Sequence, residues 1–355
     1  MEIVPFEKIQ KGDWNKFCKK SDDAWFWHLS EWIEYTLHYS PESQAENFSF
    51  ALVNNGQIEA VVPLILESND GIREFAYGRN YTPMPALKHG LSSENRITLF
   101  KEIFENIDRI SADKKIDRSK FRFSVINPGF LENKSEKYNV PLRFGYVDNS
   151  IQTQILDLSL SIEELKSNLR HGHKSDIVRA EKEVEIKIFD KQNFSEEVFE
   201  MYVKAKTGDG KSKRPQKTFD IMKTHMRDGE GFMAVAYYKG VAVSFSYFFI
   251  YKNNSYYGSA VTLNDAPDLP IAHLLQWKSI LYMKERGIKF YEIGWQVFWE
   301  NFSDFSSPKE VNISKFKRGF GGDTYPLYMS EKYYNKDLFL KVWKERVERV
   351  HKNLK

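Results

Sequence analysis

The sequence predicts an α/β (α+β) protein of 355 residues in which one structural pattern occurs twice. In each half, helical segments alternate with short antiparallel strands that are joined by tight turns. These turns are Asn54-Asn55-Gly56-Gln57 in the first half and Tyr238-Lys239-Gly240 in the second. Asn-Gly between apolar runs is typical of a hairpin, because that turn needs positive φ. We therefore predict two domains of similar structure without repeated sequence.

The first half predicts two helices and three strands, with Ser92 as a plausible helix cap because its hydroxyl can accept from a backbone amide. The expected elements are a helix at Trp25 to Leu37, strands at Phe48 to Val53 and Ile58 to Leu66, a helix carrying the apolar residues Ile97 to Ile110, and a strand at Phe121 to Ile126.

The second half opens with Ser161-Ile162-Glu163-Glu164, a capping box that predicts one long helix to about Lys182. A later buried helix stops at Gly287, the usual left-handed terminator. The other expected elements are strands at Val184 to Phe189, Phe232 to Tyr237, Val241 to Ile250, Ser255 to Val261 and Ile288 to Ile293, and helices at Ser195 to Ala205, Phe219 to Met226 and Ile271 to Arg286. We predict domains at 1–150 and 151–335, followed by a basic helix at 336–355.

Composition excludes several classes of protein. The net charge of +3 gives the whole molecule no strong field for nucleic acid, so any basic function must be local. The single cysteine, Cys18, excludes an internal disulfide framework. His171 and His173 lie two apart in a helical pattern and point to different faces, and we predict no metal site. No apolar run approaches the ~18 residues of a membrane span, so a cytoplasmic protein without a transmembrane segment is expected.

Four segments of the second half carry a resemblance to a known family. They are LRHGHKSDIVRAEKEVEIKI, GVAVSFSYFFIYKNNSYYGSA, PIAHLLQWKSILYMKERGIKFYEIGW and FKRGFGG. Together they resemble the Fem-type (FemABX) transferases and related acyltransferases with a duplicated acetyltransferase (GNAT) fold. The segments FALVNNGQIEAVVPLIL and YGRNYTPMPAL resemble the first of the two folds. The similarity covers roughly Ala24 to Tyr334 and is strongest from Leu169 onward.

The resemblance implies two tandem GNAT-like domains that transfer an acyl or aminoacyl group to an amine. In the Fem branch the donor is aminoacyl-tRNA and the acceptor is a peptidoglycan precursor, and other members act in cell-surface glycan assembly. We therefore expect a nucleotide-linked or lipid-linked glycan precursor as the phosphorylated acceptor. No tightly bound cofactor and no DNA are expected, whereas peripheral contact with a membrane remains open.

Two departures from the family leave the donor open between acyl-CoA and aminoacyl-tRNA. The segment Thr262 to Pro270 holds two aspartates and no glycine where a single-fold acetyltransferase has a glycine-rich loop for the coenzyme A pyrophosphate. Backbone amides at the following helix start still offer an anion site. In addition, no insertion is obviously able to form the coiled-coil arm of some Fem proteins.

The segment Ile313 to Gly322 predicts a basic, aromatic, glycine-rich loop for an anionic ligand. Its glycines let backbone amides approach the ligand, and Lys315, Lys317 and Arg318 supply charge. By resemblance, Lys317 contacts phosphates of the acceptor. The alternative is a basic surface turn whose glycines serve only geometry.

Two residues are candidates for the chemistry of amine acylation, which needs a deprotonated amine. Glu292 comes near the end of a strand, where the family often has an acidic residue, and is able to orient or deprotonate the amine. Tyr257 is a candidate proton donor. The alternatives are that Glu292 caps neighbouring amides and that Tyr257, one of nineteen tyrosines, has a structural role.

The remaining candidates are ligand-binding residues. Arg170 and Lys174 lie one helical turn apart in the basic helix, Arg79 and Tyr81 are expected to line the acceptor groove, and Trp295 is placed to stack on a sugar or base. The alternative for each is a structural or solvated role. The basic segment Lys204 to Lys217 is either a phosphate-capturing loop or a flexible connection. The rival to an enzyme is a non-catalytic tRNA-binding or other nucleic-acid-binding protein on the same fold.

Overall fold

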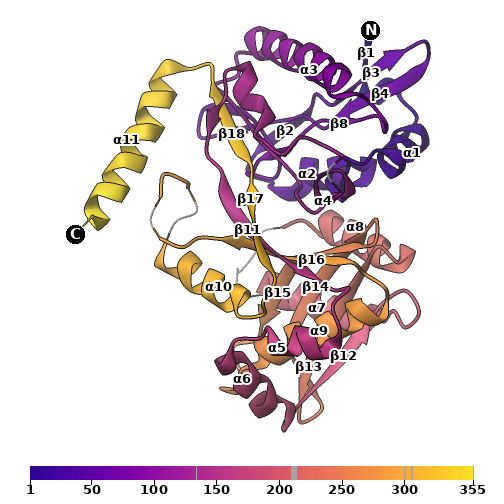
Figure 1. Cartoon of the computed structure of the whole chain (residues 1–355), viewed down its shortest axis with the longest axis vertical. Coiled ribbons are helices and arrows are strands. Elements are labelled where there is room, and N and C mark those ends of the chain that lie inside the picture. Colours follow the sequence, from indigo (N-terminus) through magenta and orange to yellow (C-terminus); the bar gives the residue numbers. More distant parts are fainter. Residues whose placement is uncertain (133, 209–213, 300, 305–306, 355) are drawn as a thin grey trace. The chain divides into compact units, whose positions relative to one another are not determined.

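The computed structural model describes residues 1–132, 134–208, 214–299, 301–304 and 307–354, and its elements mix helices with mostly antiparallel strands (Figure 1). The α/β class is therefore confirmed. The chain divides into two compact units. Unit 1 comprises Met1–Gln152, Val297–Pro308 and Pro326–Lys355, and unit 2 comprises Thr153–Gln296 and Lys309–Tyr325. Residues 297–308 and 326–335, which the predicted boundaries placed in the C-terminal domain, thus group with unit 1.

Among the described residues, unit 1 is built on two sheets. The smaller sheet has the strand order β1-β3-β4-β8, with β1 (Glu2–Pro5), β3 (Phe50–Asn54), β4 (Gln57–Val62) and β8 (Ala86–Leu87). The larger has the order β10-β18-β9-β6-β5-β2, and β7 also pairs with β9. Its strands are β2 (Gln44–Asn47), β5 (Ile65–Asn69), β6 (Ile72–Ala76), β7 (Thr82–Pro83), β9 (Arg118–Arg122), β10 (Val147–Asp148) and β18 (Met329–Tyr333).

The hairpin between β3 and β4 forms as predicted, with Asn55 and Gly56 both at positive φ. The single strand predicted at Ile58 to Leu66 is wrong, because β4 and β5 belong to different sheets. Pro63 separates them, and proline has no N–H to donate to a ladder. The next amide, that of Leu64, donates to the Ser49 hydroxyl at 2.9 Å instead.

The longest helices among the described residues of unit 1 are Ser93–Lys114, with 22 residues, and Lys336–Asn353, with 18. Its helical elements are η1 (Phe6–Lys8), α1 (Lys11–Lys20), η2 (Phe26–His28), α2 (Ser30–Tyr39), α3 (Ser93–Lys114), α4 (Pro128–Leu131), η3 (Val140–Phe144) and α11 (Lys336–Asn353). The predicted cap of α3 is confirmed, since the Ser92 hydroxyl accepts from the Asn95 amide at 3.3 Å. The helix predicted at Trp25 to Leu37 is instead the short η2 followed by α2.

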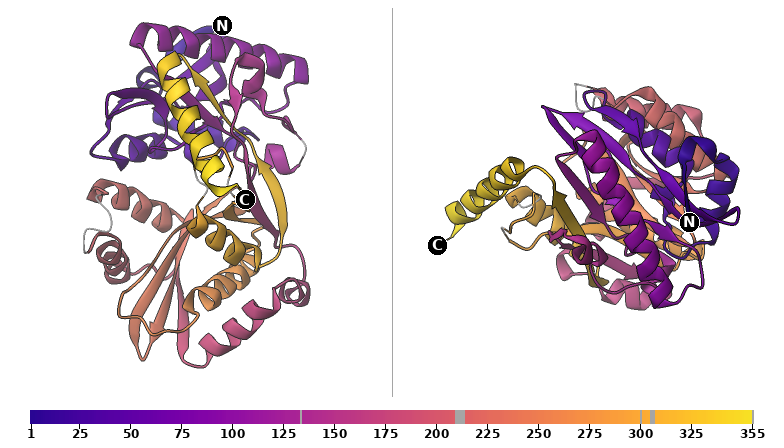
Figure 2. Two further views of the ribbon diagram at one scale, coloured as in Figure 1. Left: turned by 90° about the vertical axis from the view of Figure 1, so that its left-hand side faces the viewer. Right: turned by 90° about the horizontal axis from the view of Figure 1, so that it is seen from above.

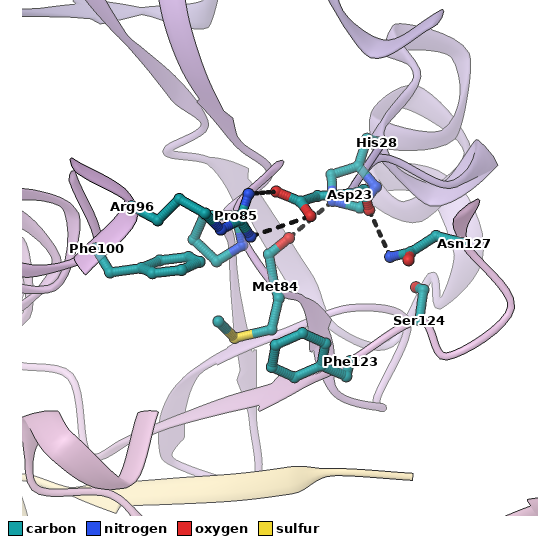
Figure 3. A pocket seen from close by; sticks show the side chains of 9 residues that line it. All are labelled: Asp23, His28, Met84, Pro85, Arg96, Phe100, Phe123, Ser124 and Asn127. Carbon is teal, nitrogen blue, oxygen red and sulfur yellow. Dashed lines mark hydrogen bonds and ion pairs between the residues drawn. The ribbon is translucent and has the colours of Figure 1, made fainter. Parts of the chain in front are cut away.

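A small pocket in unit 1 is lined by a buried ion-pair group (Figure 3). Arg96 contacts Asp23 at 3.0 Å and donates to both carboxylate oxygens of Glu136 at 2.7 Å. His28 contacts the Met84 carbonyl through Nε2 at 2.7 Å. The three charged side chains are at most 9% exposed. The attraction between Arg96 and the two carboxylates therefore has to offset the cost of removing these charges from water.

In its described residues, unit 2 is built on one seven-stranded sheet of order β12-β13-β14-β15-β16-β11-β17. The strands are β11 (Ile151–Asp157), β12 (Val184–Phe189), β13 (Gly231–Tyr238), β14 (Val241–Tyr251), β15 (Asn254–Thr262), β16 (Phe290–Gln296) and β17 (Asp323–Leu327). The helices are α5 (Ile162–Ser167), α6 (His171–Glu181), α7 (Glu196–Thr207), α8 (Gln216–Asp228), α9 (Ile271–Glu285) and α10 (Pro308–Arg318).

Helices cover both faces of this sheet (Figure 2). On one face, Phe248 of β14 belongs to the core beneath α9 and α6. On the other, the neighbouring Tyr247 donates its hydroxyl hydrogen to the Met222 carbonyl of α8 at 2.8 Å and stacks on Tyr202 of α7. Adjacent residues of one strand thus enter two separate cores, as the period of two requires.

Two expectations about the helices of unit 2 need correction. The capping box at Ser161 forms both of its bonds with Glu164, but the helix that it opens is only α5. A new helix, α6, begins at His171, so the long helix predicted to Lys182 is two helices. The predicted basic loop from Ile313 is also wrong up to Arg318, because those residues form the last part of α10.

Candidate functional site

The centre of the unit 2 sheet contains a place where two neighbouring parallel strands part. β15 and β16 pair only over Asn254–Tyr256 and Phe290–Glu292, although β15 continues to Thr262 and β16 to Gln296. Beyond Tyr256 and Glu292 the facing backbone groups no longer bond to each other. Backbone N–H and C=O groups need partners, so such an opening suits an extended ligand segment.

Glu292 lies at the last paired position of this opening. Its side chain is buried at 4% exposure, and one carboxylate oxygen accepts a hydrogen bond from the Thr153 hydroxyl of β11 at 2.7 Å. This bond fixes the direction of the carboxylate. Glu292 thus provides an oriented acceptor at the point where the strands part.

Lys317 reaches the same region from the last turn of α10. A Cβ atom added to Gly294 would lie 2.8 Å from the Lys317 ammonium nitrogen, so the ammonium occupies the space that the glycine leaves. Burial lowers the pKa of Lys317 below its ordinary value, although attraction to Glu310 and Glu292 opposes this change. The structure therefore brings the predicted pair Lys317 and Glu292 together around Gly294.

The other two basic candidates of α10 differ from Lys317 in their surroundings. Arg318 donates to the Gln296 side-chain oxygen at 2.9 Å, at the end of β16. Desolvation lowers the pKa of Arg318. Lys315 is exposed to solvent. Arg318 thus borders the opening, and Lys315 offers a nearby exposed cation for comparison.

The glycines after α10 do not form the anion-binding loop that the sequence predicted. They follow a helix C-terminus, which carries partial negative charge and repels anions. The amides of Phe320 and Gly321 already donate to the Lys317 and Arg318 carbonyls, at 3.2 and 3.0 Å. An added Cβ would lie 2.9 Å from the Asn168 Cβ at Gly321 and 2.4 Å from the Ile155 carbonyl oxygen at Gly322. These two glycines therefore serve close packing.

The start of α6 holds the end of α10 in place. The Arg170 amide donates to the Gly319 carbonyl at 2.9 Å, and His173 contacts the Phe316 carbonyl through Nε2 at 2.8 Å. His173 is fully buried, whereas His171 is exposed, which confirms that the two histidines point to different faces. Arg170 thus participates in packing between the helices.

Lys174, the second basic candidate of this helix, is half-buried. Its ammonium donates to the Ser167 carbonyl at 3.0 Å. This bond bridges α5 and α6, and Lys174 has no contact with α10 among the hydrogen bonds and ion pairs that the described residues make. Arg170 is the N-cap residue of α6 and accepts from the Lys174 amide at 3.2 Å, so the two keep the predicted spacing of one turn, whereas the break before Arg170 separates them from α5.

Tyr257 and Glu292 point to opposite faces of the sheet. Tyr257 pairs with Phe248, its ring lies 5.5 Å from the Phe248 ring, and burial raises its pKa. It packs against the core beneath α9. Tyr256 is the residue that pairs with Glu292 and shares its face. Tyr256 was not among the predicted site residues, although strand alternation together with the register would have indicated it.

This duplicated arrangement has counterparts among solved structures. The structure of FemX matches with a TM-score of 0.65 and 12% sequence identity, over 97% of this chain and 100% of that chain. This chain has the FemX fold.

Two further likenesses support the same fold. The C-terminal domain of a putative lysylphosphatidylglycerol synthetase from Agrobacterium fabrum matches with a TM-score of 0.58 and 12% identity, covering 90% of this chain and 91% of that chain. A tandem GNAT protein from the clavulanic acid biosynthesis pathway matches with a TM-score of 0.52 and 12% identity, covering 94% of this chain and 98% of that chain. The predicted FemABX-like, duplicated GNAT fold is confirmed. No protein-family model and no curated protein sequence matches the chain.

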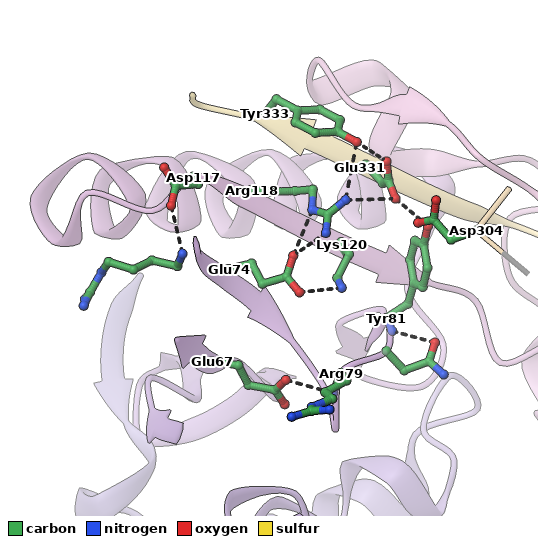
Figure 4. A network of polar contacts seen from close by, with 12 residues as sticks. Glu67, Glu74, Arg79, Tyr81, Asp117, Arg118, Lys120, Asp304, Glu331 and Tyr333 are labelled. Atoms are coloured by element: carbon green, nitrogen blue, oxygen red, sulfur yellow. Dashed lines mark hydrogen bonds and ion pairs between the residues drawn. The ribbon is translucent and has the colours of Figure 1, made fainter. Parts of the chain in front are cut away.

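In the first unit of this FemX fold, the two candidates for the acceptor groove have structural partners (Figure 4). The Tyr81 side chain is 2% exposed and donates its hydroxyl hydrogen to Glu331 at 2.6 Å. Arg79 has positive φ, and its guanidinium pairs with Glu42 at 2.9 Å. Tyr81 thus belongs to a buried polar network, while Arg79 lies at the surface.

The last candidates lie near the strand opening or outside the described residues. Trp295 is half-buried on β16, three residues after the last paired position, Glu292. Residues 209–213 of the basic segment Lys204 to Lys217 lie outside the described part of the chain. Lys206, within that segment, contacts the Ala260 carbonyl of β15 at 3.3 Å, and burial lowers its pKa. Within the described residues, no helix has the length and apolar run needed to cross a bilayer.

Proposed function

We propose that the protein is an acyltransferase that joins an activated acyl or aminoacyl group to an amine by direct attack. The observation that carries this proposal is the grouping of Lys317 and Glu292 around Gly294, at the place where β15 and β16 part. The opening suits an extended donor segment, the carboxylate suits an amine, and the ammonium suits a developing negative charge. The fold likeness to FemX supports the same reaction class.

Glu292 is the residue that we assign to the amine. It accepts a proton as the amine nitrogen bonds to the acyl carbon, and the donor's thiol or hydroxyl leaves with a proton. Thr153 donates to the carboxylate and holds it in one direction. A positioned base of this kind contributes roughly 10²–10⁴-fold to a rate.

Lys317 is assigned to the oxygen that becomes negative in the transition state. A donor in a partly desolvated site stabilises such an oxygen more strongly than one in water. The resemblance implies a different role, contact with a phosphate of the acceptor. The two roles separate in kinetics, because loss of a phosphate contact raises KM, whereas loss of oxyanion stabilisation lowers kcat.

The geometry before α9 favours aminoacyl-tRNA over acyl-CoA as the donor. A coenzyme A pyrophosphate would need free amides at this helix start. The Ile271 amide already donates to Leu269 at 2.8 Å and the His273 amide to Pro270 at 3.1 Å. With Asp265 close by in sequence, this helix start is poorly suited to a pyrophosphate.

For the acceptor, we propose an amine on a nucleotide-linked or lipid-linked cell-surface precursor. The fold likeness to the C-terminal domain of a putative lysylphosphatidylglycerol synthetase adds a phospholipid to the acceptors that should be tested, with a headgroup hydroxyl in place of the amine. All of these acceptors share an anionic phosphate. Arg318, which borders the opening beside Gln296, is the cation that we assign to it.

The test is product formation by mass spectrometry with each donor and with nucleotide-linked or lipid-linked acceptors. Glu292→Gln and Lys317→Ala are expected to lower turnover strongly while the protein stays folded. Lys315→Ala is the matched control, because Lys315 lies on the same helix but is exposed. Unchanged turnover in the first two variants would overturn the assignment.

The rival function, non-catalytic tRNA binding, makes a different prediction for the same proteins. Wild type would bind tRNA in a salt-sensitive manner, binding would survive Glu292→Gln and Tyr257→Phe, and no acyl product would form. Salt-sensitive binding together with product formation supports the transferase.

A further inference from the structure

The position of Lys317 depends on contacts that reach α10 from another helix. In the sequence, Lys317 stands between Phe316 and Gly319. The backbone carbonyls of both residues accept hydrogen bonds from the start of α6. Gly319 lies so close to His173 that an added Cβ would be 2.1 Å from its Nε2 atom. The last turn of α10 is thus in direct contact with the His173 ring.

The contacts of His173 determine which of its nitrogens carries the proton. Because Nε2 lies 2.8 Å from a carbonyl oxygen, Nε2 must be the donor. Nδ1 lies 3.3 Å from the Arg170 guanidinium, which only donates, so Nδ1 is the acceptor. The neutral imidazole satisfies both partners, and the protonated one does not.

Aromatic rings hold the His173 side chain from the other elements packed against it. Phe320 lies 4.8 Å away and Phe316 5.7 Å away between ring centroids. The His273 ring of α9 lies 4.5 Å away, edge-on. The ring therefore has little room to turn.

We propose that His173 is the positioning residue of the site, which holds the last turn of α10 so that the Lys317 ammonium lies over Gly294. This inference rests on the proposed function for the catalytic role of the Lys317 ammonium over Gly294. The position of the ammonium can itself be measured without any substrate. His173 acts through the Phe316 carbonyl and through direct packing on Gly319.

The contact is sensitive to acid. The groups that face His173 are Arg170 and Asp176 of the α6 segment and His273 of α9. Burial lowers the pKa of His173 below 6.5, so the ring is neutral at neutral pH. The contact between His173 and the Phe316 carbonyl is complete above about pH 6.5. It weakens as the pH falls through the lowered pKa of His173, because a proton on Nδ1 would face the Arg170 guanidinium.

The first experiment measures the pKa of Lys317 by acetic anhydride labelling across pH, with site-resolved mass spectrometry. His173→Gln and His173→Asn are the matched pair, because a glutamine amide reaches the Nε2 position and an asparagine amide does not. The lowered pKa of Lys317 should persist in the Gln variant and rise toward the ordinary value of about 10.4 in the Asn variant. Lys315 serves as the internal control and should label alike in all three proteins.

The second experiment uses turnover with the donor and acceptor that wild type accepts. His173→Asn should lower kcat by about 10²-fold, as a misplacement near 1 Å does, and should add nothing in the Lys317→Ala background. The Gln variant should retain most of the wild-type rate. A simple loss of fold would instead add to the effect of Lys317→Ala.

The outcomes distinguish this inference from the proposed function. An unchanged Lys317 pKa in a folded Asn variant would refute the positioning role, whatever the activity. A shifted Lys317 pKa in a protein without transferase activity would keep the positioning role and reject the proposed function.

Discussion

Glu331→Gln tests how a buried carboxylate stabilises unit 1. Glu331 lies on β18 with its side chain 1% exposed and accepts from Arg346 at 2.9 and 3.0 Å. Tyr81 and Tyr333 each donate a hydroxyl hydrogen to it at 2.6 Å. Burial raises the pKa of Glu331, but the hydrogen bonds and charge of Arg346 outweigh burial and lower it to about 2.

The sign and size of the effect follow from this pKa. The folded pKa lies below the ordinary value of 4.5, so the stabilisation is complete above pH 4.5 and is lost as the pH falls toward 2. A difference of about 2.5 units corresponds to about 3 kcal/mol, of which about 2 kcal/mol is lost by pH 3. At neutral pH the Gln variant lacks this charge while Arg346 keeps its two bonds to Asp304, so the variant should be less stable by about the same 3 kcal/mol.

The measurement is hydrogen exchange of β9 and β18 peptides at several urea concentrations, at pH 7 and pH 3, for wild type and variant. The Gln variant should be less stable at pH 7, and the gap should narrow by about 2 kcal/mol at pH 3, because only wild type loses this carboxylate. Other carboxylates titrate in both proteins and cancel. A gap of equal size at both pH values would refute the reasoning.

Three further predictions concern packing and charge. Gly319→Ala should cost about 1–3 kcal/mol in thermal unfolding because its Cβ meets the buried His173 ring, whereas Gly172→Ala, whose nearest neighbour would be 3.9 Å away, should be neutral or stabilising. Lys317→Arg should keep the charge yet lower kcat by roughly 10²-fold, since a guanidinium does not fit where the ammonium lies over the glycine; kcat near wild type would show that charge alone suffices. Arg96→Leu should lower the free energy of unfolding by about 3–5 kcal/mol in urea titrations, because two carboxylates lose their buried partner; a loss below 1 kcal/mol would contradict this.

Local chemistry made part of the fold predictable. The turn at Asn55 and Gly56 and the Ser161 capping box are set by residues within four positions of each other, and both formed as predicted. The strand break at Pro63 was also readable, since proline excludes a central ladder position. It was missed because apolar residues continue on both sides of it.

The site was predictable only where its parts lie in short motifs. The resemblance pointed to Lys317 and Glu292, which the structure brings together. The face of Tyr257 depends on pairing with β14 and β16 and on the register shift between Tyr247 and Phe248, none of which one strand reveals. His173 had no signal, because its partner is a carbonyl 143 residues later in the chain.

The place of β18 in unit 1 has a consequence for synthesis on the ribosome. This strand lies between β10 and β9, yet it is translated after the whole of unit 2. Until Met329–Tyr333 emerges, β9 presents an open edge to the cell, and unpaired edges invite aggregation. Unit 2, whose residues are complete at Tyr325, is able to fold first. A nascent chain stalled before β18 should therefore protect unit 2 from protease while leaving unit 1 digestible.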